Sequence, residues 1–353
     1  MDFRSPAYIT DAVIARTAHG IFGYSRIPGR YFKAVLGWLD RRHGIKAGIE
    51  NIQYGGSVVL AINEMVKTFS CPGDKIIIQT PVYYPFYSVV RDNNRIISEN
   101  KLVEDDLCYS MDLDDLEKKL RDPLTKMMII CNPHNPVGRV WTREELENVC
   151  ELCIRNDVLL ISDEIHSDIV YGENKHCSLF NMENMSGNGG LILFSPSKTF
   201  NIPSLASCVV LTKNKEAADK FKKSYDKGHH LPVNPITIEA AIAAYTHGDE
   251  WTDSLVEYLD ENRSVISAHL DNSSVGYIKP QGTYLAWLDF RKSGIEKSHI
   301  NKFIASEAGV GLSDGIDFGD AGAGFQRLNF GCPKKKLEEG LARIVDILPG
   351  GGT

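Results

Sequence analysis

A strand, a helix and a second strand are predicted in succession by residues 126–164, KMMIICNPHNPVGRVWTREELENVCELCIRNDVLLISDE. The runs KMMIICN (126–132) and VLLISDE (158–164) are apolar without strict alternation, which is typical of strands covered on both faces in a parallel sheet. Between them, Thr142 followed three residues later by Glu145 forms a capping box, which marks the start of a helix. This order of elements predicts an α/β fold.

The same alternation extends along most of the chain. Further buried strands are predicted at 75–80, 190–197 and 207–212, with amphipathic helices at 57–69, 85–93, 112–120 and 142–156. After about residue 230 the pattern changes to long helices at 234–247 and 250–272, then strands at 277–280, 283–290 and 325–331 and helices from 298 and 333. We expect a large domain with a mostly parallel sheet over residues 25–248 and a smaller α+β domain formed by 1–24 and 249–353.

The composition is that of a globular protein and excludes several classes. With 353 residues the chain has roughly two domains. The net charge of −7 argues against a nucleic-acid partner, and no apolar run approaches the roughly 18 residues of a membrane span. Eight cysteines are scattered and most lie within apolar runs, which favours reduced, buried thiols in a cytoplasmic protein. Cys150 and Cys153 repeat at helical spacing with Leu146 and Val149, so we expect a core face and no metal site.

Two charged features follow predicted strands, where the ligand site of an α/β sheet lies. In SPSKTFNIP (195–203), Lys198 can form a covalent imine while the preceding serine hydroxyls bind an anion, although the segment alone also fits a solvated loop. In SDEIH (162–166), Asp163 and Glu164 must point to opposite sides of an extended backbone. One of these carboxylates can therefore face a site, unless the segment is only a surface turn.

Two turns complete the set. In NPHNPVGRVWT (132–142), two Asn-Pro steps force an extended turn that could hold Asn135 toward a ligand, although a structural turn would need the same prolines. In QYGGSVVLAI (53–62), a Gly-Gly-Ser turn opens a helix, and the free N–H groups of a helix N-terminus bind phosphate well. A plain helix cap is the alternative for this second turn.

In this order, the four features resemble the fold-type I pyridoxal-phosphate enzymes of the aminotransferase superfamily. Within it the chain is most similar to the MalY/PatB-type cystathionine β-lyases, or C–S lyases, over essentially its whole length. The residues that carry this narrower likeness are HGIFGYSR (19–26), TPVYYPFY (80–87), SDEIHSDIVYG (162–172), SKTFNIP (197–203), GTYLAWLDFR (282–291) and FQRLNFGCP (325–333).

The resemblance implies roles for the residues around the ring of pyridoxal 5′-phosphate. Lys198 matches the lysine that holds the cofactor covalently and later abstracts the α-proton, and Asp163 matches the carboxylate paired with the pyridine nitrogen. Asn135 matches the side chain bonded to the phenolic oxygen, and Tyr83 matches the aromatic residue stacked on the ring. His166 stands where aspartate aminotransferases carry tyrosine, and a purely structural histidine beside the ring is equally open.

The resemblance also implies the remaining contacts. The phosphate would be bound by donors of Gly56, Ser57, Val58, Ser195 and Ser197. Tyr24 matches a catalytic-site tyrosine that reaches the phosphate of the neighbouring subunit, which implies a homodimer with shared active sites. Arg327 matches the arginine that clamps the substrate α-carboxylate. Tyr84 and Tyr87 are expected to pack.

The function implied is C–S β-lysis of cystathionine- or cysteine-type substrates to a thiol, pyruvate and ammonia. A pyridoxal-phosphate-dependent aminotransferase is the alternative, because it shares every cofactor contact, and a pyridoxal-phosphate-binding regulatory protein is a third reading. Residues 1–3, MDF, resemble the end of a segment that in relatives follows further residues, so the N-terminal arm is expected to be truncated.

Overall fold

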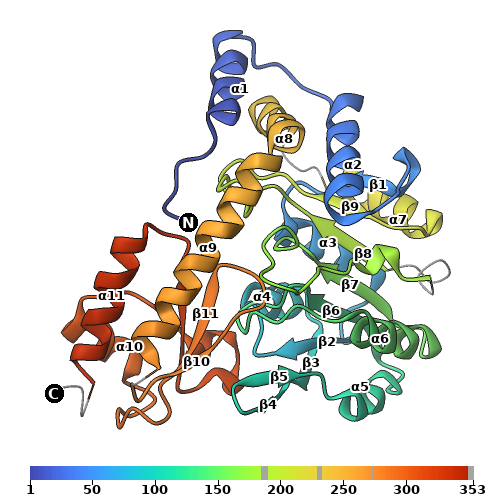
Figure 1. Ribbon diagram of the computed structural model, residues 1–353. Coiled ribbons are helices and arrows are strands. Elements are labelled where there is room, and N and C mark those ends of the chain that lie inside the picture. The colour runs from blue at the N-terminus through green and yellow to red at the C-terminus, as the bar shows by residue number, and fades with distance from the viewer. Residues whose placement is uncertain (184–189, 229–232, 272, 349–353) are drawn as a thin grey trace.

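The computed structural model describes residues 1–183, 190–228, 233–271 and 273–348 (Figure 1). Within these residues, a seven-stranded sheet with helices on both faces stands beside a smaller four-stranded sheet. The large sheet has the order β1-β9-β8-β7-β6-β2-β3. Its strands are β1 (Ile52–Tyr54), β2 (Lys75–Thr80), β3 (Ile96–Lys101), β6 (Thr125–Cys131), β7 (Leu159–Asp163), β8 (Leu191–Phe194) and β9 (Val209–Leu211).

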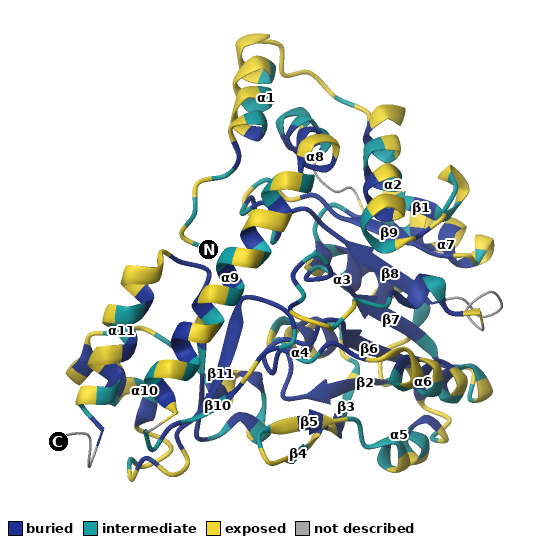
Figure 2. Ribbon diagram, viewed as in Figure 1, coloured by how far each residue is buried: buried dark blue, intermediate teal, exposed yellow. Residues whose placement is uncertain are grey.

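Alternate residues of the strands face opposite sides, and both sides are buried (Figure 2). Met127 and Ile129 of β6 belong to one core cluster, whereas Met128 and Ile130 belong to another. The first cluster includes α3 (Val58–Phe69), α4 (Pro85–Asp92) and α7 (Lys215–Lys227). The second includes α2 (Gly29–His43), α5 (Leu113–Leu120), α6 (Arg143–Arg155) and α8 (Pro235–His247). The predicted α/β fold with a mostly parallel sheet is confirmed.

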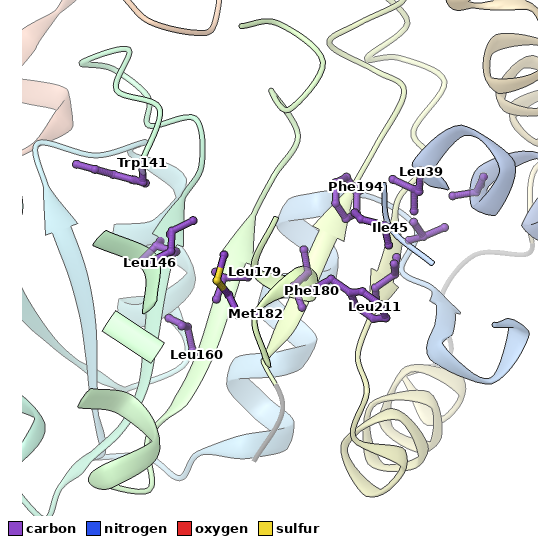
Figure 3. Packing of buried hydrophobic residues seen from close by; sticks show 14 of the residues in the cluster. Leu39, Ile45, Trp141, Leu146, Leu160, Leu179, Phe180, Met182, Phe194 and Leu211 are labelled. Atoms are coloured by element: carbon purple, nitrogen blue, oxygen red, sulfur yellow. The ribbon is translucent and has the colours of Figure 1, made fainter. Parts of the chain in front are cut away.

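The second cluster fixes α2 against the middle of the sheet. Phe194 of β8 and Leu211 of β9 pack in it with Leu39 and Ile45, which lie at the end of α2 (Figure 3). Each of these side chains is at most 3% exposed. The C-terminal end of α2 is therefore held just behind the strand that precedes Lys198.

One strand differs from the expected direction. The run at 207–212 forms β9 as a strand, but β9 is antiparallel to both β8 and β1. A parallel neighbour requires a crossover, usually a helix, between the two strands. Residues 195–208, all of them described, form turns without a helix, so the chain returns in the opposite direction.

Five of the eight cysteines are buried as expected, Cys177 is half-buried, and Cys71 and Cys108 are exposed. Cys150 and Cys153 are buried on α6, where the capping box of Thr142 and Glu145 starts the helix as predicted. All eight cysteines lie in described parts of the chain and are free thiols. Cys71 and Cys108 are exposed because they lie in a turn and on a surface hairpin of β4 (Val103–Asp105) and β5 (Cys108–Ser110).

The smaller sheet is antiparallel, with the order β10-β11-β13-β12. Its strands are β10 (Gly276–Ile278), β11 (Leu285–Asp289), β12 (Ser313–Asp314) and β13 (Phe325–Asn329). The same part of the chain contains the helices α9 (Asp249–Leu270), α10 (Ile300–Phe303) and α11 (Lys334–Asp346). The expected end of the long helix at residue 272 lies outside the described residues. No helix in the described ranges combines the length and apolar character needed to cross a membrane.

The N-terminal segment contacts both cores. Met1 and Phe3 pack against the core of the small sheet, whereas Ile9 of α1 (Ala7–Ala18) lies in the large-sheet cluster beside α8. We propose a large domain over 25–248 and a small domain formed by 1–24 and 249–353, with α1 as the part of the small domain's chain that packs on the large one.

Candidate active site

The four polar features of the sequence meet at one edge of the large sheet. A cavity of about 340 Å³ lies there, beyond the carboxyl ends of β2, β6, β7 and β8. The predicted site residues that line it are Ser57, Val58, Tyr83, Asn135, Asp163, His166, Ser197, Lys198 and Arg327. Residues far apart in the sequence are thus brought together by the parallel strands that precede them.

Asp163 is a buried acid at the end of β7. Its side chain faces the cavity, and Oδ1 accepts a hydrogen bond from the Ile165 amide at 3.2 Å. No ion pair joins it to another described residue, and burial raises the pKa of Asp163 to about 7. A cationic ligand atom beside it would restore the ionised form.

Glu164 points to the opposite side of the same backbone, as the alternation predicts. Its carboxylate accepts hydrogen bonds from Ser162 Oγ and from the Leu179 amide, each at 3.0 Å. The His176 Nε2 atom lies 2.9 Å from the other oxygen. Glu164 therefore holds the loop that carries His176 and Leu179 in place, while the Asp163 carboxyl faces the cavity and can contact a ligand.

Lys198 lies in the turn after β8, with its side chain in the cavity. It makes no hydrogen bond or ion pair with any residue that the structure describes. Burial lowers the pKa of Lys198, and the charge of Arg327 acts in the same direction, while Asp163 opposes both. A lowered pKa increases the fraction of neutral amine, which is the form that can act as nucleophile or base.

The start of α3 forms one corner of the cavity. Ser57 is the N-cap, and its Oγ accepts from the Leu60 amide at 3.3 Å. Gly56 has φ +72°, and a Cβ there would lie 2.6 Å from the Tyr225 hydroxyl oxygen. Glycine is thus required for the turn that brings the free N–H groups of α3 to the cavity, although Gly56 itself does not line it.

The serines before Lys198 supply further donors. Ser197 lines the cavity, whereas Ser195 lies behind it and is 7% exposed. The Ser195 hydroxyl donates to Ser197 Oγ at 3.0 Å and accepts from the Ser197 amide at 3.2 Å. Ser195 therefore orients Ser197 in this structure.

Arg327 joins the two sheets across the cavity. It projects from β13, and its Nη1 donates to Asn135 Oδ1, in the loop after β6, at 3.1 Å. Its Nη2 donates to Ser313 Oγ at 3.2 Å, and its guanidinium carbon lies 4.7 Å from the centre of the Phe318 ring. These three contacts fix the orientation of the planar guanidinium beside the cavity.

His166 and Tyr83 complete the polar lining. His166 is 4% exposed, and its Nδ1 has no hydrogen-bond partner among the described residues. Burial lowers the pKa of His166 well below its ordinary value, so the ring is neutral. Its ring packs edge-on to Tyr284 at 5.5 Å. Burial raises the pKa of Tyr83 to about 12.

Tyr24 is not brought to this cavity. It lies in an extended segment after α1 and is 96% exposed. A side chain so exposed cannot act within this cavity of the same chain. Its predicted role requires a second subunit.

Several residues that line the cavity were not predicted from the sequence. Tyr84 was expected to pack, but it is 49% exposed and lines the cavity, whereas Tyr87 is buried and donates to the Phe318 carbonyl as a packed residue would. Residues not singled out include Val59, Pro203, Tyr284, Leu285 and Asn329. Asn329 follows Arg327 by two residues on one strand, and this spacing could have found it. No cluster of His, Cys, Asp or Glu in the described ranges could hold a metal ion.

Comparisons with known proteins show which proteins this chain resembles. Cystathionine beta-lyase PatB from Bacillus subtilis (strain 168) is 39% identical over 99% of this chain and 90% of its own length. Protein MalY from Escherichia coli (strain K12) is 35% identical over 99% and 90%. Cystalysin from Treponema denticola, whose crystal structure contains a pyridoxal 5′-phosphate cofactor, superposes with a TM-score of 0.93 at 31% identity, covering 98% of this chain and 88% of cystalysin. The model of the family "aminotransferase class I and II" matches residues 8–344, and the chain therefore belongs to this family.

Proposed function

We propose that this chain is a pyridoxal 5′-phosphate-dependent C–S β-lyase that cleaves cystathionine- or cysteine-type amino acids to a thiol, pyruvate and ammonia. The observation that carries the proposal is the placement of Lys198 and Asp163 in one buried cavity beside an anion-binding helix end. The relatives named cystathionine beta-lyase and the cofactor of cystalysin support it.

The residues present fit this cofactor. Asp163 is a buried carboxylate without a cationic partner among the described residues, and a protonated pyridine nitrogen would supply one. His166 Nδ1 is a buried polar atom without a partner in the described chain. The start of α3 and the hydroxyl of Ser197 offer donors for a phosphate. The ring nitrogen would thus meet a carboxylate without a cationic partner, and the phosphate would meet the N–H groups at the start of α3, whereas Asn135 is bonded to Arg327 in this structure.

Each residue then has a specific task. When bound, the cofactor supplies an electron-withdrawing ring that stabilises negative charge at the substrate α-carbon. Asp163 would hold the proton on the ring nitrogen, Asn135 would bind the phenolic oxygen, and Tyr83 would cover the ring. Of the predicted phosphate ligands, Ser57, Val58 and Ser197 line the cavity and would hold the phosphate, while Ser195 would orient Ser197 and Gly56 would permit the turn before α3.

Lys198 and Arg327 act on the substrate. Arg327 binds the α-carboxylate through its fork of N–H groups, and this contact replaces its bond to Asn135. The Lys198 amine first holds the cofactor and then, once free, takes the proton from the substrate α-carbon at Nζ. Its lowered pKa keeps part of the amine neutral for this step.

Product analysis tests the reaction type. Purified protein is incubated with L-cystathionine or L-cystine, with and without an added 2-oxo acid. Pyruvate formed without the acceptor supports the lyase, because an aminotransferase needs the acceptor for turnover. Product that requires the acceptor would instead assign the chain as an aminotransferase.

We also propose a cytoplasmic homodimer with shared active sites. The segment around Tyr24 exposes large apolar side chains, with Ile21 66% and Phe22 59% exposed, which favours a covered surface. Eight free thiols favour a reducing compartment. Mixed dimers of Tyr24→Phe and Lys198→Ala subunits test the shared site. They should recover activity, because one of their two sites is intact, whereas sites built within single subunits would stay impaired.

A further inference from the structure

Behind the cavity, a buried hydrogen bond links the two loops that carry Asp163 and Lys198. The Thr199 hydroxyl donates to Asp168 Oδ2 at 2.6 Å. Thr199 directly follows Lys198, and Asp168 lies two residues after His166. Thr199 is fully buried, and neither partner lines the active-site cavity. The bond therefore joins the loops on the side away from the substrate.

Helix α2 fixes the carboxylate of this bond. His43 Nε2 lies 2.8 Å from Asp168 Oδ1, and Trp38 Nε1 donates to the same oxygen at 3.1 Å. The side chains of His43 and Asp168 are each only 6% exposed. Burial alone would raise the pKa of Asp168, but the bonds from His43 and Thr199 hold it below its ordinary value. Asp168 is therefore an ionised acceptor with a single orientation.

The backbone of Thr199 is held as well. Trp251 Nε1, on α9, donates to the Thr199 carbonyl at 3.1 Å. The next residue, Phe200, is fully buried and packs edge-on against Trp38 at 5.6 Å. Helices α2 and α9, which approach from different parts of the fold (Figure 1), thus hold the residue after Lys198 at both its side chain and its carbonyl.

The side chain of Lys198 has no such support. It has no hydrogen-bond partner among the described residues, and a lysine chain has four flexible carbons. The position of its amine therefore depends on where the backbone at Lys198 is held. Because a displacement of about 1 Å can lower a rate about 100-fold, that backbone needs a firm anchor.

We propose that Asp168, oriented by His43 and Trp38, is a positioning residue that holds Lys198 in place through the hydroxyl of Thr199. The proposal rests on the proposed role of Lys198 as the lysine that holds the cofactor. Asp168 touches neither cofactor nor substrate, and its effect is carried by the Thr199 hydrogen bond.

The experiment compares Thr199→Val with two other variants of the full chain. Thr199→Ser keeps the hydroxyl. Thr125→Val is the matched control, because Thr125 is also buried and its hydroxyl donates to the Lys119 carbonyl at 2.8 Å, but at the opposite end of β6 from the cavity. For each holoenzyme, kcat, KM and Tm are measured. Cofactor is then removed, and rebinding of added pyridoxal 5′-phosphate is followed by absorbance.

Rebinding separates affinity from placement of the amine. The added cofactor first binds reversibly, and the Lys198 amine then condenses with its aldehyde carbon, forming one carbon–nitrogen double bond and releasing one water. Borohydride reduces this bond, and mass spectrometry identifies the labelled lysine. We expect Thr199→Val to slow the covalent step and to lower kcat, each about 10- to 100-fold, with little change in KM or in the first step. Thr199→Ser should restore both rates.

Other results of these measurements would overturn the proposal. If Thr199→Val lowers only Tm, as Thr125→Val should, the network is merely structural and the proposal is overturned. If Thr199→Val does not fold, Trp38→Phe removes one donor to Asp168 while keeping an aromatic ring. A slower covalent step in Trp38→Phe supports the proposal, and an unchanged one overturns it. Lys198→Ala distinguishes the underlying assignment: if it labels at the same rate on another lysine, the role of Lys198 itself is wrong.

Discussion

The two walls of the active-site cavity are built in different ways. The large-domain wall is built where parallel strands end, with Asp163 as the last residue of β7 and Lys198 in the turn after β8. The small-domain wall consists of side chains on antiparallel strands themselves, such as Leu285 on β11 and Arg327 on β13. The first wall holds the groups suited to a cofactor, and the second holds one cation among largely uncharged surface. We therefore expect the large domain to govern cofactor chemistry and the small domain to govern substrate binding.

The largest effect should come from Lys198→Ala on the large-domain wall. We expect activity to fall by about 10⁴-fold, the upper end of what a positioned general base contributes, and the absorbance of the lysine-bound cofactor to disappear. Steady-state kinetics and absorbance spectra measure both, with circular dichroism as the control for folding. Persistence of the lysine-bound absorbance would show that another lysine holds the cofactor.

Arg327→Ala should act mainly on the second wall, although it also removes the hydrogen bond from Arg327 to Asn135 on the first wall. Loss of hydrogen bonds to a charged carboxylate should lower kcat/KM by about 10- to 100-fold, mainly through KM, while cofactor affinity is unchanged. Arg327→Lys keeps the charge without the planar fork and should recover only part of the loss. If cofactor affinity falls as much as substrate affinity, the division between the walls is wrong.

Asp163→Asn should show how much the buried, ionised carboxylate of the large-domain wall lowers the free energy of unfolding of the cofactor-free protein. Between its ordinary pKa of 3.8 and its raised pKa of about 7, Asp163 keeps a proton in the folded state that it loses in the unfolded state. The free energy of unfolding therefore falls as the pH rises through this window. We expect Asp163→Asn to raise Tm at pH 8 but not at pH 4.

Thermal melts of cofactor-free protein across pH test this expectation. The exposed Asp219, which pairs with Lys215 on α7, provides the control substitution Asp219→Asn. An equal change in Tm at both pH values for Asp163→Asn would contradict a proton held by the buried carboxyl.

The smallest effect should come from Asn329→Ala, at the edge of the small-domain wall. Asn329 lines the cavity, and its side chain accepts the Gly331 amide at 3.0 Å. Loss of the one neutral hydrogen bond that we expect Asn329 to make to the substrate should raise KM about two- to tenfold and leave kcat and cofactor affinity unchanged. Inhibition or turnover of a series of thioether amino acids measures this, and a change in kcat alone would place Asn329 with the reacting groups instead.

The same difference explains what the sequence could predict. Asp163, Asn135 and Lys198 follow predicted parallel strands, whose carboxyl ends meet at one edge, so their convergence was predictable. Tyr284, which directly precedes β11, was missed because only tertiary packing decides which residues beside an antiparallel strand meet the cavity. Asn329, two residues after Arg327 on β13, could have been found from the alternation of the strand. Tyr84 was missed for another reason: nothing in the local pattern distinguishes it from the buried Tyr87 three residues later. The antiparallel direction of β9 was not predicted, because the apolar runs show where strands lie but not how they are connected. In the structure, the described residues 195–208 contain no crossover helix, so β9 returns antiparallel to β8.

The turn that carries Lys198 leaves β8 and returns through β9, two adjacent buried strands of the large sheet. Amide groups in such strands exchange with solvent mainly through global unfolding. Hydrogen exchange should therefore find Ile192 and Val210 among the slowest amides of the chain. The lysine would then belong to the last unit of the protein to open, and heat inactivation should coincide with global unfolding and not precede it.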